Sequence, residues 1–239
     1  MSQWQQYSNL IQALGIPDSV RCICAVGAGG KTSLLHRLAE EYRARGRKVL
    51  LTTTTKMYLP KEYAALDRSA EEILACLERD SFVTAGTTVS EEKMGPLPPE
   101  IWKDVVREAD VVLVEADGSR RLPLKVPGAG EPVLPAECDF LIAVEGLSGI
   151  GQPLEKVCHR LEQATKLLRC PGTQTVTEKM AVQLAKRGYQ RFSISGCYFF
   201  NQADCLSEEQ KNKIAKAMEG TEFVLGSLRE RSYLKNLAE

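Results

Sequence analysis

Residues 22–38 read CICAVGAGGKTSLLHRL, where an apolar run meets three glycines and then a Lys-Thr-Ser step into a helical pattern. Glycine tolerates positive φ and close backbone approach, so this turn can direct its amides at an anion. Such amides converge on phosphate oxygens when a helix begins directly after the turn. The lysine adds a positive charge, and the threonine hydroxyl is placed for a phosphate-bound Mg²⁺. The stretch therefore predicts a phosphate-binding loop whose nucleotide contacts are Gly27, Ala28, Gly29, Gly30, Lys31, Thr32 and Ser33.

One position departs from the usual motif of phosphate loops. The full pattern G-x-x-x-x-G-K-[ST] has its first glycine where this sequence has Ala25. The compact form G-A-G-G-K-T-S resembles the G-T-N-G-K-T-T loop of the ATP-dependent Mur ligases and folylpolyglutamate synthases. That resemblance implies a phosphate role for Gly27, Gly30, Lys31 and Thr32, and it does not extend to the substrates of those families.

Strand-like and helix-like segments alternate on both sides of this loop. Apolar strand candidates occupy residues 21–26, 48–54, 81–86, 110–116, 139–145 and 197–201, with a weaker one at 221–226. Helix candidates begin after the glycine turn and at 69–80, 98–109, 159–168, 177–188 and 207–220. This alternation predicts one α/β domain over residues 1–239, with a doubly wound, mostly parallel sheet and helices on both faces, like a P-loop NTPase. Ligands then bind at the carboxyl ends of the strands.

Local signals mark the ends of these helices and one long loop. Ser69 and Ser207 precede acidic first turns, as N-caps do, and Gly188 and Gly220 follow last turns, as C-terminal glycines do. The stretch 122–135 has four prolines and no periodicity, which predicts a loop.

A second motif, VVLVEADGSRR, supplies carboxylates for a metal. At the strand period of two, Glu115 and Asp117 point to the same side, and Gly118 lets the chain turn away. Two carboxylates at the mouth of an apolar strand favour a Mg²⁺ site, with Thr32 as a further ligand, over a solvated charge pair. The sequence leaves open which carboxylate touches the ion. Together with Lys31, these carboxylates and Arg120 form the expected catalytic set, in which Arg120 steadies a transferring phosphoryl group.

Cations and hydroxyls near the strand ends are weaker candidates for a second substrate. In LLTTTTKMYLP, Thr54, Thr55 and Lys56 lie beyond a strand on the ligand side, where they can contact a phosphate, metal or substrate. The alternative is a plain strand end, because threonine favours strands. Arg121 and Lys125 lie beside the carboxylates and suit an acidic substrate, or are solvated loop charges.

The segment CYFFNQADCLS resembles the N-K-x-D element with which GTPases recognise guanine. Asn201 and Asp204 are in place, but Gln202 replaces the lysine that lies over the base, so ATP and GTP both stay open as the nucleotide. A helix cap and turn is the alternative interpretation of Asn-x-x-Asp after an apolar strand.

Composition limits the partners. The chain has 31 basic and 31 acidic residues, so no overall positive field favours nucleic acid or an anionic membrane. It has no stretch resembling a signal peptide and no apolar run near the ~20 residues of a membrane span, which predicts a cytoplasmic protein. Its eight cysteines lack the C-x-x-C spacing of structural zinc sites.

Taken in order, these motifs resemble the YqeC family, described as accessory proteins of selenium-dependent molybdenum hydroxylases. The matching stretches are VGAGGKTSLL, LTTTTKMYLP, VEADGSRRLPLKVPGAGEPVLP, AVEGLSGIGQPL, HRLE and FFNQAD. The resemblance implies a nucleotide-dependent protein in selenium or molybdenum cofactor maturation. It also makes Glu131, His159 and Arg160 candidate substrate-site residues.

Two functional classes follow. The first is an enzyme that transfers a phosphoryl group to, or activates, a small cofactor precursor. The second is a nucleotide-gated chaperone whose slow hydrolysis times delivery to a client hydroxylase. A pseudo-enzyme that only binds nucleotide is a third alternative. The sequence does not decide the oligomeric state.

Overall fold

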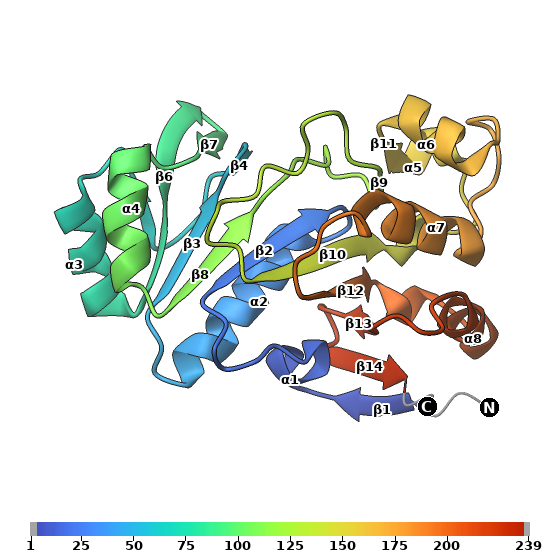
Figure 1. The fold of residues 1–239 in the computed structure, drawn as a ribbon, viewed down its shortest axis with the longest axis horizontal. Coiled ribbons are helices and arrows are strands. Elements are labelled where there is room, and N and C mark those ends of the chain that lie inside the picture. Colours follow the sequence, from blue (N-terminus) through green and yellow to red (C-terminus); the bar gives the residue numbers. More distant parts are fainter. Residues whose placement is uncertain (1–3, 237–239) are drawn as a thin grey trace.

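A twisted sheet carries helices on both faces in the computed structural model, which describes residues 4–236 (Figure 1). The strand order is β1-β14-β13-β12-β10-β2-β8-β3-β6-β7-β4, and β5 pairs with β6 beside this path. Pairing is parallel from β13 to β6, whereas β1, β14, β7 and β4 add antiparallel strands at the two edges. The expected α/β fold, with a mostly parallel sheet and helices on both faces, is confirmed.

The central strands are β2 (Cys22–Gly27), β3 (Val49–Thr53), β6 (Phe82–Ser90), β8 (Val111–Glu115), β10 (Phe140–Gly146), β12 (Gly196–Asn201) and β13 (Phe223–Ser227). The others are β1 (Trp4–Tyr7), β4 (Met57–Tyr58), β5 (Ala64–Leu66), β7 (Lys93–Gly95) and β14 (Ser232–Asn236). A separate parallel pair consists of β9 (Leu124–Lys125) and β11 (Cys158–His159).

The helices are α1 (Leu10–Leu14), α2 (Lys31–Ala44), α3 (Ala70–Asp80), α4 (Pro99–Glu108), α5 (Leu154–Val157), α6 (Leu161–Leu168), α7 (Glu178–Tyr189) and α8 (Glu208–Ala217). Two short 3-10 turns, Leu147–Gly149 and Ala203–Cys205, follow β10 and β12. No helix within residues 4–236 is both long and apolar enough to span a bilayer.

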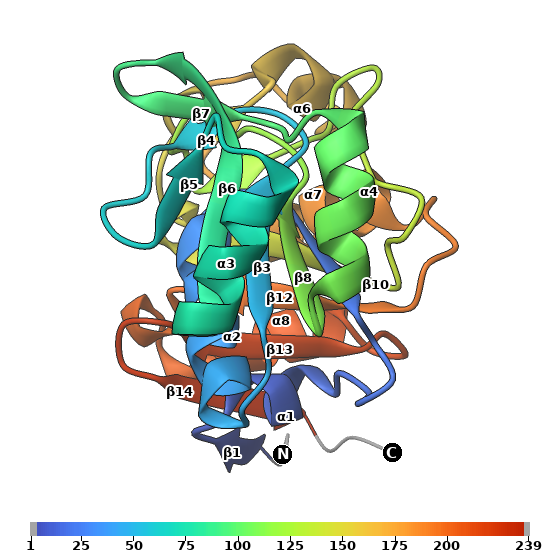
Figure 2. The same ribbon diagram turned by 90° about the vertical axis from the view of Figure 1, so that its left-hand side faces the viewer.

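The central strands are apolar along their length because both of their faces are covered. Every residue of β2, β3, β8 and β10 is buried. Ile23 and Ala25 pack in the core under α1 and α2, whereas Cys24 and Val26 pack in the core under α3 and α4. Figure 2 shows α3 and α4 side by side on their face.

The first turns of α2 are anchored in the core of the protein, and this anchoring fixes the loop that precedes the helix. Leu34, Leu35 and Leu38 are fully buried in the α1 and α2 core. Burying one such side chain stabilises the fold by about 1.5–3 kcal/mol. The packed helix therefore holds its N-terminus at the carboxyl edge of the sheet, where β2 ends.

The structure confirms most of the local expectations and corrects two of them. Ser69 and Ser207 are N-caps with capping boxes, as predicted, but Gly188 lies inside α7 and does not end it. A side chain at Gly188 would press against Pro127, so close packing explains this glycine. The stretch 122–135 is a loop except at β9, whose backbone pairs with β11. The weakly expected strand 221–226 is the parallel strand β13.

Candidate functional site

The phosphate loop, residues 27–33, joins β2 to α2 with the geometry that its glycines permit. Gly27, Gly29 and Gly30 have φ values of 94°, 76° and 129°. A side chain at Gly27 would collide with the carbonyl of Val144 on the neighbouring strand β10. Residues with a side chain rarely adopt such φ values, so the turn depends on these glycines. The loop thus opens directly onto the N-terminus of α2, which begins at Lys31.

Lys31 folds back against its own loop and a buried carboxylate. Its Nζ donates to the Gly27 carbonyl over 2.6 Å and lies 3.2 Å from Asp117 Oδ1. Both oxygens of Asp117 accept from the Gly27 amide, and the Tyr189 hydroxyl donates to Oδ2. Asp117 is fully buried. It therefore fixes the base of the loop from beneath.

Asp117 belongs to a chain of ion pairs that runs toward the solvent. Lys125 Nζ, which is also fully buried, lies 2.9 Å from Asp117 and 3.0 Å from Glu131, and donates to the Gly118 carbonyl. Arg160 Nη2 then pairs with the other oxygen of Glu131 over 2.7 Å. Burial raises the pKa of Glu131, but hydrogen bonds from Arg160, the Gly128 amide and Lys125 outweigh it and set that pKa at about 2. We call Lys31, Asp117, Lys125, Glu131 and Arg160 the ion-pair chain.

Glu115 has a different environment from Asp117, although the two are separated by one residue. Its Oε2 accepts a 2.6 Å hydrogen bond from the Thr32 hydroxyl, and its side chain reaches the cleft above the loop. Burial raises the pKa of Glu115, while Lys31 and the Thr32 hydrogen bond oppose that rise. The register of the parallel pair β3–β8 places Glu115 opposite Thr53 of β3, whose hydroxyl donates to the Glu115 carbonyl.

The oxygens around Glu115 fit a Mg²⁺ ion. The carboxylate of Glu115 and the hydroxyl of Thr32 are hard oxygen donors, the type that Mg²⁺ prefers. Thr55 Oγ1 is buried without a hydrogen-bond partner in the described chain, and Thr55 also lines the cleft. Thr54, which was expected to contact the same ligands as Thr55, does not line the cleft; its hydroxyl donates to the Val133 carbonyl.

A cleft of about 750 Å³ lies over the phosphate loop and extends away from it. The sequence-predicted residues on its wall are Gly29, Gly30, Lys31, Thr32, Ser33, Thr55, Lys56, Glu115, Arg120, Arg121, Glu131, His159, Arg160 and Asn201. The sequence missed Tyr58, Lys93 and Ser148 on the same wall. Asp117 and Lys125 lie beneath it and do not line it.

His159 lines the same cleft as its neighbour Arg160. Burial lowers the pKa of His159, and the positive charges of Lys125, Arg160 and Arg120 lower it further. The imidazole is therefore biased toward its neutral form in a cationic region. No group of three or more potential metal ligands of the His, Cys, Asp and Glu types gathers anywhere within residues 4–236.

Sequence reasoning also missed Glu145, a second fully buried carboxyl group near the loop. One of its oxygens accepts from the Lys125 amide, and the other has no partner within the described residues. Burial raises its pKa well above the ordinary range, and the charge of Asp117 adds to that effect. The sequence did contain a signal for Glu145: it lies near the end of an apolar strand, as Glu115 does.

Asn201 connects the phosphate loop to the next part of the sheet. Its Nδ2 donates to the Gly29 carbonyl over 2.8 Å, and its Oδ1 accepts from the Leu228 amide beyond β13. Asp204 is exposed, three residues further on, and lines a second hollow of about 650 Å³. The two hollows share Ser33, Ser148, Asn201 and Gln202 on their walls. Gln202, at the usual lysine position, instead accepts from the Ser148 hydroxyl.

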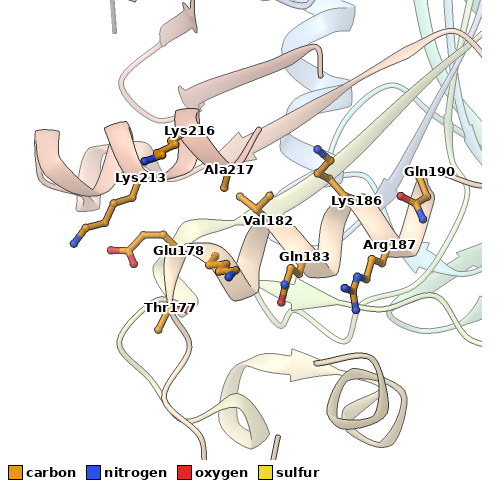
Figure 3. Close-up of a pocket in the computed structure, with 11 residues that line it drawn as sticks. Thr177, Glu178, Val182, Gln183, Lys186, Arg187, Gln190, Lys213, Lys216 and Ala217 are labelled. Atoms are coloured by element: carbon orange, nitrogen blue, oxygen red, sulfur yellow. The ribbon is translucent and has the colours of Figure 1, made fainter. Parts of the chain in front are cut away.

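A third hollow, of about 560 Å³, lies between α7 and α8 (Figure 3). Val182 and Lys186 of α7 and Lys216 and Ala217 of α8 are among the residues that line it. It shares no wall residue with the cleft over the phosphate loop. None of the sequence-predicted site residues lines this hollow.

Comparison with known proteins identifies the family. The family model described as YqeC protein matches residues 23–162, which is more than half of the chain. A protein of Escherichia coli (strain K12), named Uncharacterized protein YqeC, is 39% identical over 207 residues, covering 82% of this chain and 81% of that protein. The chain belongs to the YqeC family. The segment matched by the YqeC model includes the phosphate loop, Glu115 and the whole ion-pair chain.

Two solved structures are similar to this YqeC-family chain at low identity. The signal recognition particle 54 kDa protein of Aeropyrum pernix K1, in complex with GDP, gives a TM-score of 0.45 at 17% identity, covering 96% of this chain and 48% of that protein. The hydrogenase maturation factor HypB of Archaeoglobus fulgidus gives 0.41 at 10% identity, covering 89% and 84%. The chain thus spans about half of the first protein's length.

Proposed function

We propose that this chain binds a Mg²⁺-nucleoside triphosphate in the cleft and cleaves or transfers its terminal phosphoryl group. The observation that carries the proposal is the 2.6 Å contact between Thr32 and Glu115 beside the glycine loop and Lys31. A hydroxyl at the start of α2 and a carboxylate at the end of β8 are thereby brought together at the end of the sheet where phosphates bind.

The protein's residues divide the work of holding the phosphates. The loop amides and the N-terminus of α2 receive phosphate oxygens, and Lys31 exchanges its contact with Gly27 for one with the nucleotide. Thr32 and Glu115 hold the metal ion, with Thr55 as a further oxygen donor; the bound ion neutralises charge on the transferring group. Arg120, on the cleft wall, steadies that group, and Asp117 keeps the loop in shape.

The base is proposed to lie in the hollow that contains Asp204. An exposed carboxylate there can accept from guanine N1 and N2, whereas Asn201 is engaged by the loop and by the Leu228 amide. Adenine remains the alternative, because Gln202 replaces the lysine of the guanine motif.

For the biological role, we propose maturation of selenium-dependent molybdenum hydroxylases, as the YqeC-family membership suggests. The acceptor is then a small cofactor precursor. The second candidate is a nucleotide-gated delivery protein for a client hydroxylase, favoured by the way Asn201 links the phosphate loop to the base hollow.

Nucleotide protection against thermal unfolding tests the proposal. A nucleotide at ~100 times its dissociation constant stabilises the folded state by about 2.7 kcal/mol, so Mg²⁺-ATP or Mg²⁺-GTP should raise the melting temperature. Lys31→Ala should weaken binding at least about tenfold, because charge-assisted bonds to phosphate contribute about 1.5–3 kcal/mol. Lys103→Ala, on the exposed part of α4, is the matched control. Equal affinity of Lys31→Ala and wild type would overturn the assignment.

Turnover separates the two candidate roles. The purified protein is incubated with each nucleotide, with and without candidate small-molecule acceptors, and nucleoside diphosphate release is followed. Turnover that depends on an acceptor supports the enzyme. Slow turnover that only a client hydroxylase accelerates supports the delivery protein.

A further inference from the structure

We propose that the part of the cleft lined by β4, β7 and the loop after β8 is a separate binding compartment for an oxyanion-bearing small molecule, the acceptor of the phosphoryl group. This proposal rests on the proposed function. The acceptor compartment consists of Lys56, Tyr58, Lys93, Arg120 and Arg121, all of which line the cleft. Its ligand carries a carboxylate or a phosphate group.

Three separate parts of the chain build this compartment around one aromatic ring. Tyr58 lies in β4 and pairs with Lys93 in β7, so both side chains come from an antiparallel extension of the sheet. The Arg121 guanidinium stacks 3.9 Å from the Tyr58 ring centroid, and Lys93 Nζ lies 5.1 Å from it. Arg121 comes from the loop after β8. The ring, which is 39% exposed, therefore holds two cations together at the cleft wall.

The compartment has an excess of positive charge within a chain of zero net charge. Lys56, Lys93, Arg120 and Arg121 form no ion pair with any carboxylate in residues 4–236. The two cleft carboxylates are already engaged: Glu115 by Thr32, and Glu131 by Lys125 and Arg160. Four cations gathered on one concave wall repel one another, and an anionic ligand relieves that repulsion.

The backbone supplies a second, independent observation. Arg120 and Arg121 are consecutive residues with φ of 51° and 62°, in the left-handed region that favours glycine. This conformation is strained for a residue with a side chain, and such strain concentrates at functional sites. Arg160 and Gln202, which also line the cleft, have positive φ as well. Arginine at these positions is consistent with a need for the guanidinium groups.

The alternative is that the cleft has a single anion site, in which these cations bind only the phosphates of the nucleotide. Binding to nucleotide-loaded protein distinguishes the cases. The protein is saturated with Mg²⁺ and a non-hydrolysable nucleotide, and inorganic phosphate or malonate is titrated by calorimetry. The double variant Lys93→Gln/Arg121→Gln is compared with Lys103→Gln/Lys179→Gln, whose exposed lysines lie on α4 and α7 outside the cleft lining.

For the acceptor compartment, Lys93→Gln/Arg121→Gln should lower anion affinity at least about tenfold while nucleotide affinity changes less than about twofold. The control should change neither. Preference for phosphate or for malonate identifies which oxyanion the compartment takes. The proposal is overturned if neither anion binds the loaded wild type, or if anion affinity is unchanged in the double variant. Parallel loss of nucleotide affinity also overturns it, because the cations then belong to the nucleotide site.

Lys31→Ala separates this proposal from the proposed function. That variant should lose nucleotide binding yet still bind the oxyanion through the acceptor compartment. If wild type binds no nucleotide but retains an oxyanion site that needs Lys93 and Arg121, the nucleotide function fails and the compartment stands. If Lys31→Ala abolishes oxyanion binding while the double variant does not, the anion was bound at the phosphate loop and the compartment is refuted.

Discussion

Two buried carboxylates separated by a single residue differ in their partners and in their access to the cleft. Asp117 is fully buried and satisfied by the Gly27 amide, the Tyr189 hydroxyl and two lysines. Glu115 has one side-chain partner, Thr32, and reaches the cleft. Alternation along a strand predicted a shared face, but the chain leaves β8 at Glu115, so the alternation no longer governs Asp117.

These environments predict different outcomes for the two neutral amides. Asp117→Asn should destabilise the apo protein by about 3 kcal/mol, because it leaves buried Lys31 without a charge partner and Lys125 with Glu131 alone. Glu115→Gln should leave apo stability nearly unchanged and remove most of the Mg²⁺-nucleotide stabilisation. Thermal melts of both variants, with and without Mg²⁺-nucleotide, provide the measurement. An early-melting Glu115→Gln that retains the full ligand shift would show that Glu115 supports the fold instead of the metal.

The left-handed backbone at Arg120 leads to a stability prediction. Arg120→Gly should be about 1 kcal/mol more stable than Arg120→Ala, since both remove the guanidinium but only glycine relieves the positive φ. Urea unfolding of the two variants measures the difference. Equal stability would mean that the backbone at this position carries no strain.

At the scale of elements, the end of β12 holds the phosphate loop from the side and is itself bonded to the loop after β13. Asn201, the last residue of β12, contacts Gly29 in one direction and the amide of Leu228 in the other. The N-x-x-D interpretation therefore located a residue that organises the site. The structure places Asn201 as a brace and Asp204 as the exposed group.

Substitutions in this element should affect different parts of the nucleotide. Asn201→Ala should weaken binding of ATP and GTP alike, by about tenfold, because it loosens the phosphate loop. Asp204→Asn should specifically lower GTP affinity and raise affinity for xanthosine triphosphate, since the acceptor pair for guanine is lost. Competition binding with the three nucleotides measures both effects. Equal affinity of wild type for ATP and GTP would argue against base recognition by Asp204.

The parallel core could be predicted because strands buried on both faces are apolar throughout, and their helices show clear caps. The edge strands β1 and β14 could not, because they mix polar and apolar residues and depend on each other for pairing. The phosphate loop was predictable from three glycines and a lysine. Lys93 of the acceptor compartment was not, because its position depends on an antiparallel pairing with Tyr58.

For the whole molecule, Glu145 makes stability depend on pH. Its folded-state pKa is raised by burial, so folding favours the protonated form. This contribution is fully present below the unfolded pKa and is lost as pH rises through the folded pKa. Glu145→Gln keeps a side chain of similar shape but removes the titratable carboxyl group. The stability of this variant relative to wild type should therefore increase with pH. Urea unfolding at ~pH 5 and ~pH 8 measures this, since an ordinary glutamate titrates below both values; parallel pH dependence in both proteins would contradict it.

The two compartments of the cleft have different structural origins. The phosphate loop, Glu115 and Asn201 lie at the ends of parallel strands in the middle of the sheet, whereas Tyr58 and Lys93 belong to short antiparallel strands that extend beyond β6. Figure 1 shows this extension near the carboxyl ends of β3 and β8. Met57 and Met94 anchor the extension in the main core, whereas their neighbours Tyr58 and Lys93 line the cleft. Substitutions at Tyr58 and Lys93 therefore offer a way to change the second substrate while the buried methionines keep the extension in place and the nucleotide machinery stays intact.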